Sequence, residues 1–369
     1  LYTACAGIHP THCLPVMLDV GTNNENFLND PLYLGLERRR ERGDAYDELV
    51  DEFVSAVREM FPEALLQLED FGNCNAFRLL KKYRDTLCLF DDDIQGPGAV
   101  ALSGLLAALR ITGGNLADQR VLFFGAGQAG IGIGNTIAAA MIDQGLPIEQ
   151  SHSNCWFFDT KGLLVDSRQD IPTQKQPFAH DHAPMTSLSD AIRQLQPTAL
   201  IGCAGQGGAF TEDVVRLMAS QQERPIIFAL SNPTTKAECT AQQAYEWSDG
   251  RAVFASGSPF EPVQLDNRTF VPGQGNNAYI FPGVGLGASL ARSRRVTDEM
   301  FLAAARVLAG LVTDEDLDLG RVYPGLSQIR EVSARIAAEV AEIAYREGLA
   351  QQEPPEDILA DIREQMFQP

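Results

Sequence analysis

Two groups of acidic residues follow two apolar segments of the chain at a spacing that could hold a metal ion. Glu69 and Asp70 come after ALLQL, and three aspartates at 91–93 come after LCLF. If both segments are parallel strands, their carboxyl ends meet at one edge of a sheet, where the carboxylates repel one another unless a cation lies between them. Ligands that are all oxygen favour Mg²⁺ or Mn²⁺ over zinc. From spacing alone, two solvated acidic loops are an equal alternative.

A glycine-rich turn between a strand-like and a helix-like segment could hold a dinucleotide. The turn joins RVLFF to GIGNTIAAAMIDQG and consists of Gly125, Ala126, Gly127, Gln128, Ala129 and Gly130. Its three glycines suit a tight turn, close approach to a pyrophosphate and close packing of the helix, whose N-terminus attracts phosphate. Asp159 ends the next strand-like segment and could bind the ribose, although it lies further along than the usual spacing of about 20 residues. The alternative is a purely structural turn.

Three further residues follow strand-like segments and could contact a ligand without adding charge. Gly205 belongs to a second glycine cluster after ALIGC, Asn232 lies in ALSNPT, and Asn277 lies in PGQGNNAYIFPG. In an α/β sheet they would lie at the edge where ligands bind. Asparagine in turns rich in glycine and proline is usually present for its backbone conformation, so these residues alone do not define a site.

Strand-like and helix-like segments alternate along the chain, which predicts an α/β protein with a mainly parallel sheet. Strands are expected at 14–20, 64–68, 87–90, 120–124, 155–158, 199–203, 225–230 and 252–255. The clearest helices are expected at 44–60, 98–111, 127–145, 211–222, 297–310 and 327–348, and a short acidic helix is expected after Pro354-Pro355. Such a sheet would position the acids, the glycine turn and the asparagines at one edge.

The composition excludes several classes of partner. The chain has 369 residues, a formal net charge of −20 and no basic block, which argues against a nucleic-acid or anionic-membrane partner. Its seven cysteines are scattered, which favours a reducing, cytoplasmic compartment. The longest apolar stretch, Ala99 to Leu109, is too short to span a bilayer. The chain starts at Leu1 without a methionine, so we expect it to be part of a longer protein.

The chain resembles the malic enzyme family from Leu1 to about Glu347. The resemblance is carried by LYTACAG, LDVGTNNE, LEDFGNCNAFRLL, DDIQG, FGAGQAGIGI, FALSNPT, FASGSPF and GQGNNAYIFPG. It implies oxidative decarboxylation of (S)-malate to pyruvate and CO₂, with reduction of NAD⁺ or NADP⁺ and a divalent metal. The implied fold is a Rossmann-like, doubly wound parallel sheet inserted in a second α/β domain for substrate and metal. The expected division is a partial substrate and metal domain at 1–91, a dinucleotide domain at 92–277, a helical return at 278–350 and a tail at 351–369.

The resemblance also implies roles for individual residues. Glu69, Asp70 and Asp93 match the metal ligands, and Asp92 matches the acid that partners the catalytic lysine. Asn232 and Asn277 match amides that contact malate or nicotinamide. The implied coenzyme contacts are Asn73, Gly125, Ala126, Gly127, Gln128, Ala129, Gly130, Asp159, Lys175, Gly205 and Asn232.

The sequence departs from the family pattern in two respects, and two alternative functions stay open. The family's general-base lysine, proton-donor tyrosine and substrate-binding arginine lie upstream of Leu1, so a metal- and dinucleotide-binding fragment without activity is one alternative. Asp91 and Pro97 stand where the family commonly has asparagine and a small residue. A hydroxy-acid dehydrogenase that does not decarboxylate is a further alternative. Relatives suggest a homodimer or homotetramer.

The identity of the coenzyme depends on opposing features of the sequence. Asp159 alone favours NAD, because a carboxylate accepts from ribose hydroxyls and repels a 2′-phosphate. The segment Asp159-Thr160-Lys161-Gly162 resembles the version in NADP-using members, and Lys175 matches their lysine for the 2′-phosphate. We therefore favour NADP; an ordinary loop lysine at 175 is the alternative.

Overall fold

A seven-stranded sheet organises the larger part of the chain. The computed structural model describes residues 1–368, except for the side chain of Asn73. The prediction that Asn73 contacts the coenzyme therefore lies outside the described residues. The strand order is β11-β8-β7-β6-β3-β4-β5, with all pairs parallel except β4 and β5. The strands are β3 (Val121–Phe124), β4 (Cys155–Asp159), β5 (Gly162–Leu163), β6 (Ala199–Gly202), β7 (Ile226–Ala229), β8 (Val253–Ser256) and β11 (Gly273–Gln274). The predicted fold class is confirmed.

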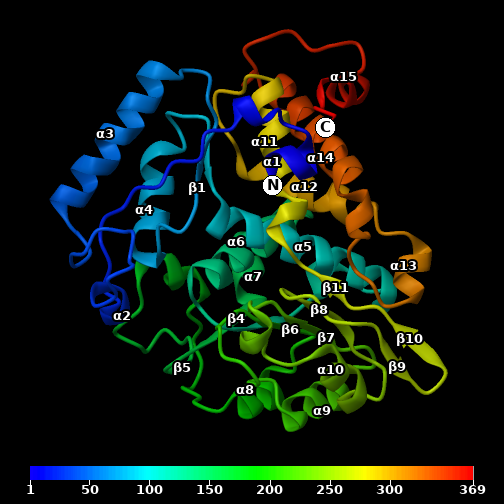
Figure 1. Cartoon of the computed structure of the whole chain (residues 1–369). Helices are drawn as coiled ribbons and strands as arrows, with labels where there is room; N and C mark the ends of the chain where they lie inside the picture. The colour runs from blue at the N-terminus through cyan, green and yellow to red at the C-terminus, as the bar shows by residue number, and fades with distance from the viewer. Residues whose placement is uncertain (369) are drawn as a thin grey trace.

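Helices cover both faces of this sheet because its strands alternate between two cores. Val121 and Phe123 face one core, with α5 (Asp92–Thr112) and α6 (Gln128–Asp143), whereas Leu122 faces the other, with α8 (Leu188–Leu195), α9 (Glu212–Gln221) and α10 (Ala241–Trp247). Figure 1 shows these two helical layers above and below the sheet. Successive side chains of a strand point to opposite faces, so a strand that is apolar throughout must be covered twice.

The chain reverses its direction across the sheet between β3 and β6. From β3 it continues to β4 on one side, and it then returns to β6, which pairs with β3 on the other side. The connections that leave the carboxyl ends of β3 and β6 therefore run to opposite sides, to β4 and to β7, and open α/β sheets bind ligands at such a point. The topology thus places Gly125, which follows β3, at the switch point of the sheet.

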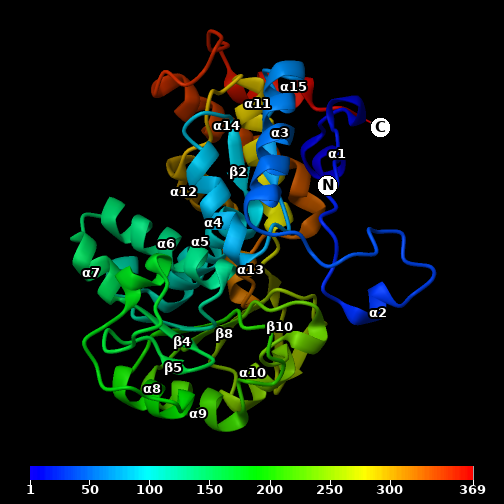
Figure 2. The same ribbon diagram turned by 90° about the vertical axis from the view of Figure 1, so that its left-hand side faces the viewer.

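A smaller unit contains the first acidic residues. Its sheet consists of β1 (Leu66–Leu68) and β2 (Leu89–Asp91), which pair in parallel. The long helix α3 (Asp44–Met60) and α4 (Asn73–Tyr83) lie beside this sheet (Figure 2). Val50, Val54 and Leu79 share a core with Leu68 and Leu89. The prediction that 64–68 and 87–90 are parallel neighbours is confirmed.

Helix α5 begins six residues before the predicted start at 98 and runs through Pro97. Asp92 and Asp93 lie in its first turn, where acids interact favourably with the helix dipole. Among residues 1–368 it is the one helix that is long and apolar enough to cross a membrane. The sequence prediction considered only the stretch Ala99 to Leu109, which is too short. In the structure, 78% of the most apolar 18 residues of the helix are buried inside the protein. This is the burial of a core helix, packed between the sheet and the C-terminal helices.

The remaining predicted helices all form, with ends that differ by at most a few residues. The expected helices at 211–222, 297–310 and 327–348 correspond to α9, α12 (Asp298–Gly310) and α14 (Ile329–Arg346). The short helix after the two prolines is α15 (Ile358–Gln365). The other helices are α1 (Tyr2–Ala6), α2 (Glu25–Leu28), α7 (Ile148–Ser153), α11 (Phe281–Leu290) and α13 (Asp314–Asp318). The domain boundaries at 91, 277 and 350 stay a prediction.

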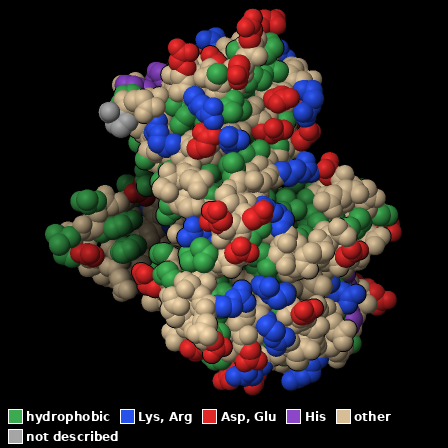
Figure 3. All heavy atoms as spheres, turned by 90° about the vertical axis from the view of Figure 1, so that its right-hand side faces the viewer, with side chains coloured by type: hydrophobic (Ala, Val, Ile, Leu, Met, Phe, Trp, Pro, Cys, Tyr) green, Lys and Arg blue, Asp and Glu red, His purple; other side chains and the backbone are tan. Residues whose placement is uncertain are grey.

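The strand predicted at 14–20 does not form. These residues run without regular structure, and Met17 and Leu14 are 88% and 69% exposed. Figure 3 shows hydrophobic side chains on the lobe that projects at the left, where α2 lies. A strand needs a hydrogen-bonded partner, and among residues 1–368 no strand pairs with this segment. A short apolar run was therefore insufficient evidence for a strand.

Candidate active site

The glycine turn has the backbone that its sequence predicts. Gly125 has a φ of 121°, and a Cβ there would lie 2.8 Å from the backbone nitrogen of Ala204. A Cβ on Gly130 would lie 2.4 Å from the carbonyl oxygen of Gly125. Both positions therefore require glycine, one for the turn and one for the close packing of α6 against it. Gly127 caps the N-terminus of α6, so the backbone N–H groups of the first turn are available to an anion.

A cavity of about 700 Å³ extends from this turn to the acidic cluster. It lies at the carboxyl ends of β3, β4 and β6, and its lining includes the following residues: Asp93, Phe124, Gly125, Ala126, Gly127, Gln128, Ala129, Phe158, Asp159, Thr160, Lys175, Cys203, Ala204 and Gln206. A volume of this size is typical of small-molecule and cofactor sites. The cavity brings together predicted metal and coenzyme residues that are up to 82 positions apart in the sequence, from Asp93 to Lys175.

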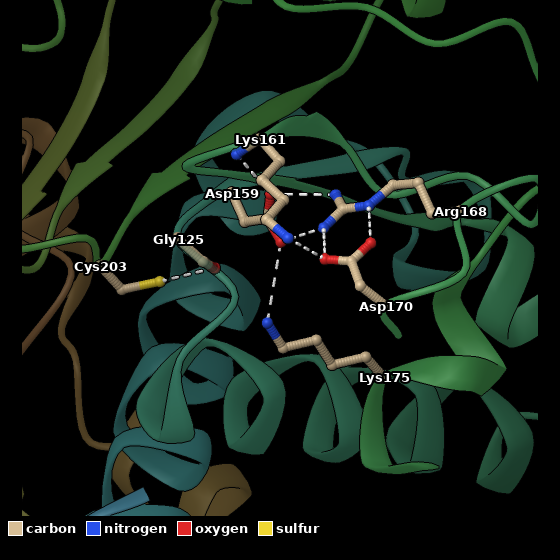
Figure 4. A network of polar contacts seen from close by, with 7 residues as sticks. All are labelled: Gly125, Asp159, Lys161, Arg168, Asp170, Lys175 and Cys203. Carbon is tan, nitrogen blue, oxygen red and sulfur yellow. Dashed lines mark hydrogen bonds and ion pairs between the residues drawn. The ribbon is translucent and has the colours of Figure 1, made fainter. Parts of the chain in front are cut away.

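Asp159 does not present a free negative charge to this cavity. The Arg168 guanidinium donates two hydrogen bonds of 2.9 Å to its carboxylate, and the Lys161 N–H donates a third of 2.8 Å. The Lys175 ammonium lies 3.8 Å from Asp159 Oδ2. Figure 4 shows Arg168 bonded to both Asp159 and Asp170, and Lys175 approaching Asp159 from below. Three cations (Lys161, Arg168 and Lys175) therefore surround two carboxylates, so the local charge is positive.

Arg168 was missed by the sequence interpretation. It lies in an irregular segment nine residues after Asp159, where neither helical nor strand periodicity indicates which side chains meet. Only 14% of its side chain is exposed, and the side chain of Asp159 is 13% exposed. A bidentate ion pair at this burial is stronger than a typical surface pair. Arg168 thus holds Asp159 in place and neutralises it.

The Arg168→Met substitution is expected to destabilise the protein by about 2 kcal/mol at pH 7, because it leaves the Asp159 carboxylate without its bidentate donor. Burial raises the pKa of Asp159, but the hydrogen bonds from Arg168 and Lys161 outweigh it, so the pKa lies below its usual value. The stabilisation is therefore complete above the unfolded pKa of about 3.9 and is lost as the pH falls through the lower folded value. Urea denaturation from pH 7 to below about 4 measures this.

The control for this experiment is Arg193→Met. Arg193 pairs with Asp190 on the surface of α8, where both side chains are more than half exposed, so its removal is expected to change the unfolding free energy by less than about 1 kcal/mol. If the difference between the Arg168→Met variant and the unsubstituted protein stays constant down to the lowest pH at which both fold, the ion pair is not the source of the destabilisation.

The acidic residues after β1 and β2 lie side by side. Leu68 pairs with Asp91 in the parallel ladder, so Glu69 and Asp92 follow at the same edge. The backbone N–H of Asp70 donates to Asp93 Oδ2 at 2.8 Å. Asp70 has a φ of 60°, a left-handed conformation that aspartate tolerates better than most residues. The predicted meeting of the two acidic groups is confirmed.

Burial and, to a smaller extent, repulsion between like charges raise the pKa values of Glu69, Asp91, Asp92 and Asp93. Desolvation, with repulsion from Asp93, raises the pKa of Asp91 to about 7. Burial and the neighbouring Glu69 raise the pKa of Asp92, which is 3% exposed. Desolvation also raises the pKa of Glu69 and of Asp93. A cation among these carboxylates would offset their mutual repulsion and favour their ionised form.

The donor chemistry of this cluster fits a hard divalent cation. Glu69, Asp70 and Asp93 offer carboxylate oxygens only, which Mg²⁺ and Mn²⁺ prefer. Among residues 1–368, however, no group of three or more His, Cys, Asp or Glu side chains is arranged to hold a metal ion as it stands. The ligand set therefore stays a prediction. Its members share one edge of β1 and β2, and binding would require them to converge.

Asp92 and Asn277 meet although they are far apart in the sequence. Asn277 Nδ2 donates to Asp92 Oδ2 at 3.2 Å across 185 residues. A Cβ on Gly96 would lie 2.1 Å from Asp92 Oδ1 and 3.0 Å from Asn277 Nδ2, so only glycine leaves this contact undisturbed. The predicted catalytic acid and one predicted substrate amide thus belong to one site at the N-terminus of α5.

Gly205 and Asn232 lie on two loops that a buried carboxylate joins. The Gly205 N–H donates to Ser231 Oγ at 2.8 Å, and Ser231 Oγ donates to Glu238 Oε1 at 2.5 Å. Glu238 is fully buried, and burial raises its pKa. It also accepts from the Ala204 N–H at 3.3 Å. Glu238 therefore holds the loop after β6 against the loop after β7; its segment, AECT, gave no sequence signal for this role.

Proteins that place a glycine turn at the switch point of a parallel sheet bind dinucleotides there, and this chain is a protein of that class. The family model described as "Malic enzyme, NAD binding domain" matches residues 94–345, and "Malic enzyme, N-terminal domain" matches residues 1–84. The chain belongs to the malic enzyme family.

Individual relatives agree with this assignment. The NADP-dependent malic enzyme of Columba livia is 52% identical over 370 residues, covering all of this chain and 66% of that protein. The mitochondrial NADP-dependent malic enzyme of Homo sapiens is 51% identical over 372 residues, covering all of this chain and 62% of that protein. The chain thus spans just under two thirds of these curated relatives. The crystal structure of Entamoeba histolytica malic enzyme has the same fold, with a TM-score of 0.75, 24% identity and coverage of 99% of this chain and 67% of that one.

Proposed function

We propose that this protein catalyses the oxidative decarboxylation of (S)-malate to pyruvate and CO₂, with transfer of the malate hydride to NADP⁺. The observation that carries the proposal is the single cavity that runs from the glycine turn to Asp93. A hydride can pass directly only between a nicotinamide and a substrate held in the same enclosed space. The sequence identity to proteins named NADP-dependent malic enzymes supports the same reaction.

In and around this cavity, which is lined by the glycine turn and Asp93, each part of the site would have a separate task. The first turn of α6 would bind the pyrophosphate, while Asn232 and Asn277 would offer amide donors to malate or nicotinamide. Asp92, held by Asn277, would partner the family's catalytic lysine, which the family places upstream of Leu1. Glu69, Asp70 and Asp93 would hold Mg²⁺ or Mn²⁺, which when bound lowers the pKa of the malate hydroxyl and stabilises the enolate.

The environment of Asp159 supports NADP as the coenzyme. An unpaired carboxylate at this strand end would repel a 2′-phosphate, but Arg168 already neutralises Asp159. Lys175 lines the cavity, so its ammonium could pair with the phosphate. NAD stays the alternative, because Asp159 could still accept from ribose hydroxyls if Arg168 were displaced.

The test is malate-dependent reduction of NADP⁺ and of NAD⁺ with Mn²⁺, performed on this chain and on any longer form that its gene encodes. We expect pyruvate and CO₂ in equal amounts, with NADP⁺ preferred. Turnover only by the longer form would support a fragment that binds coenzyme and metal without activity. Oxidation of malate without release of CO₂ would instead support a non-decarboxylating hydroxy-acid dehydrogenase, and turnover by neither form would contradict the proposal.

We also propose a cytoplasmic location and a homodimeric or homotetrameric assembly. The scattered cysteines support a reducing compartment, although relatives include proteins named mitochondrial. The division into domains at 1–91, 92–277, 278–350 and 351–369 belongs to the same proposal. Sedimentation velocity of the purified protein measures the assembly directly.

A further inference from the structure

Two hydrogen bonds in series connect the N-terminal helix to one of the proposed metal ligands. The Tyr2 hydroxyl donates to Gln67 Oε1 at 2.5 Å, and Gln67 Nε2 donates to Glu69 Oε2 at 3.0 Å. Tyr2 lies in α1, whereas Gln67 and Glu69 lie on and just after β1. The series therefore joins residues 65 positions apart in the sequence, and nothing in the reaction assigned to the site accounts for it.

The chemistry of the three groups fixes the direction of both bonds. An ionised Glu69 carboxylate accepts hydrogen bonds and cannot donate one. Gln67 must therefore present its NH₂ group to Glu69, because the opposite orientation would place two acceptor oxygens against each other. This leaves the amide oxygen of Gln67 facing Tyr2, whose hydroxyl can donate. The carboxylate thus sets the orientation of the Gln67 amide, and the hydrogen bond from Tyr2 stabilises that orientation.

The ring of Tyr2 is held in place by its packing, so its hydroxyl has a defined position beside Gln67. Its ring packs edge-on against Phe281, with ring centroids 5.2 Å apart. A Cβ on Gly285 would lie 2.6 Å from Tyr2 Cε1, so this glycine of α11 makes room for the ring. Burial, with smaller contributions from Asp92 and other neighbours, raises the pKa of Tyr2 well above its usual value. The hydroxyl therefore remains a donor.

Glu69 needs such support because its neighbours in the cluster are carboxyl groups, and apart from Gln67 only a smaller hydrogen-bond contribution from Asp92 favours its ionised form. Its side chain is exposed at the strand end, and Asp93 and Asp70 act on it as like charges. Without a donor beside it, the carboxylate would rotate away from those acids into solvent. A hydrogen bond from Gln67 keeps it at the edge where the other two proposed ligands lie.

We propose that Tyr2 and Gln67 are positioning residues that hold Glu69 in the orientation that binds the divalent cation. The proposal rests on the assignment of Glu69 as a ligand in the proposed function. Outer groups that orient metal ligands commonly change metal affinity by about 10- to 100-fold when they are removed. Because Tyr2 acts through Gln67, removing both groups should have no more effect than removing Gln67 alone.

The experiment measures Mn²⁺ binding to the purified protein from the electron paramagnetic resonance signal of free Mn²⁺. Gln67→Met keeps the length of the side chain and removes both hydrogen bonds, and it is expected to raise the Mn²⁺ Kd about tenfold. Tyr2→Phe removes only the hydroxyl and should raise the Kd by less. In the Gln67→Met background, Tyr2→Phe should produce no further change. Glu69→Gln, measured in parallel, reports whether Glu69 is a ligand at all.

The controls separate this inference from the proposed function and from damage to the fold. NADPH binding, followed by its fluorescence, should be unchanged in every variant, and each variant should still unfold in one cooperative transition, with a thermal midpoint lowered only by the loss of its hydrogen bonds. Tyr323→Phe removes a buried hydroxyl that donates to the Val100 carbonyl at 2.9 Å, and it should leave the Mn²⁺ Kd unchanged. If Glu69→Gln weakens Mn²⁺ binding while Gln67→Met does not, or if Tyr2→Phe acts equally in both backgrounds, the positioning role is wrong. If Glu69→Gln has no effect, or the unsubstituted protein binds no Mn²⁺, the ligand assignment itself fails.

Discussion

The Glu69→Gln substitution is expected to reduce malate-dependent NADP⁺ reduction about 1,000-fold while NADPH binding is unchanged. Glutamine has the shape of glutamate without its charge, so the variant loses one anionic oxygen ligand at the strand end after β1. A bound metal ion contributes several kcal/mol of charge stabilisation, and each 1.36 kcal/mol corresponds to tenfold in rate. Steady-state kinetics at several Mn²⁺ concentrations measure the effect on kcat and on metal dependence.

The matched control is Glu63→Gln, which makes the same chemical change six residues earlier. Glu63 pairs with Arg292 at 3.1 Å on the surface, where both side chains are more than half exposed. Loss of an exposed pair has an effect of at most about 1 kcal/mol on stability and should leave turnover unchanged. Full metal-dependent turnover by the Glu69→Gln variant would show that the acidic cluster does not hold the catalytic cation.

The Lys175→Ala substitution is expected to raise the KM for NADP⁺ about 30-fold and to leave the KM for NAD⁺ within about twofold. Lys175 lines the cavity beside Asp159, and a charge-assisted bond to a 2′-phosphate contributes about 2 kcal/mol, which corresponds to this factor at 1.36 kcal/mol per tenfold. NAD⁺ has no phosphate at this position and should be insensitive. Comparison of kcat/KM for the two coenzymes, before and after the substitution, gives the change in preference.

Lys82→Ala is the control for this measurement. Lys82 forms an exposed ion pair with Asp51 on the surface of α4, so its loss should change neither coenzyme constant. An unchanged preference in the Lys175→Ala variant would identify Lys175 as an ordinary loop lysine and would remove the main support for NADP. A parallel rise in both constants would indicate that Lys175 binds a part that the two coenzymes share.

Local sequence signals were sufficient for most of the secondary structure. Helix α3 begins and ends where the pattern of 44–60 predicts, because a continuous apolar stripe at helical spacing defines both its face and its length. The glycines at 125 and 130 were predicted correctly because turn geometry and close packing depend on neighbouring residues. The segment 14–20 was predicted wrongly, since a strand depends on a partner that its own residues cannot specify.

The candidate site was predictable where its residues follow strands. Parallel pairing brings strand ends to one edge, so the meeting of the acids after β1 and β2 followed from their positions alone. The glycine turn and Asp159 were placed at the sheet edge by the same rule. Residues on irregular segments offered no such rule, and Arg168 and Glu238 were therefore missed.

The sequence by itself determined the alternation of elements, the glycine turn, the acidic strand ends and the family. Tertiary structure alone decided which charges and donors meet. Arg168 neutralises Asp159, Asn277 reaches Asp92 across 185 residues, and Tyr2 of helix α1 reaches Gln67 of strand β1. The physical reason is range: turn geometry and periodicity act over a few neighbouring residues, whereas the partner of a buried charge or amide is set by how distant segments pack.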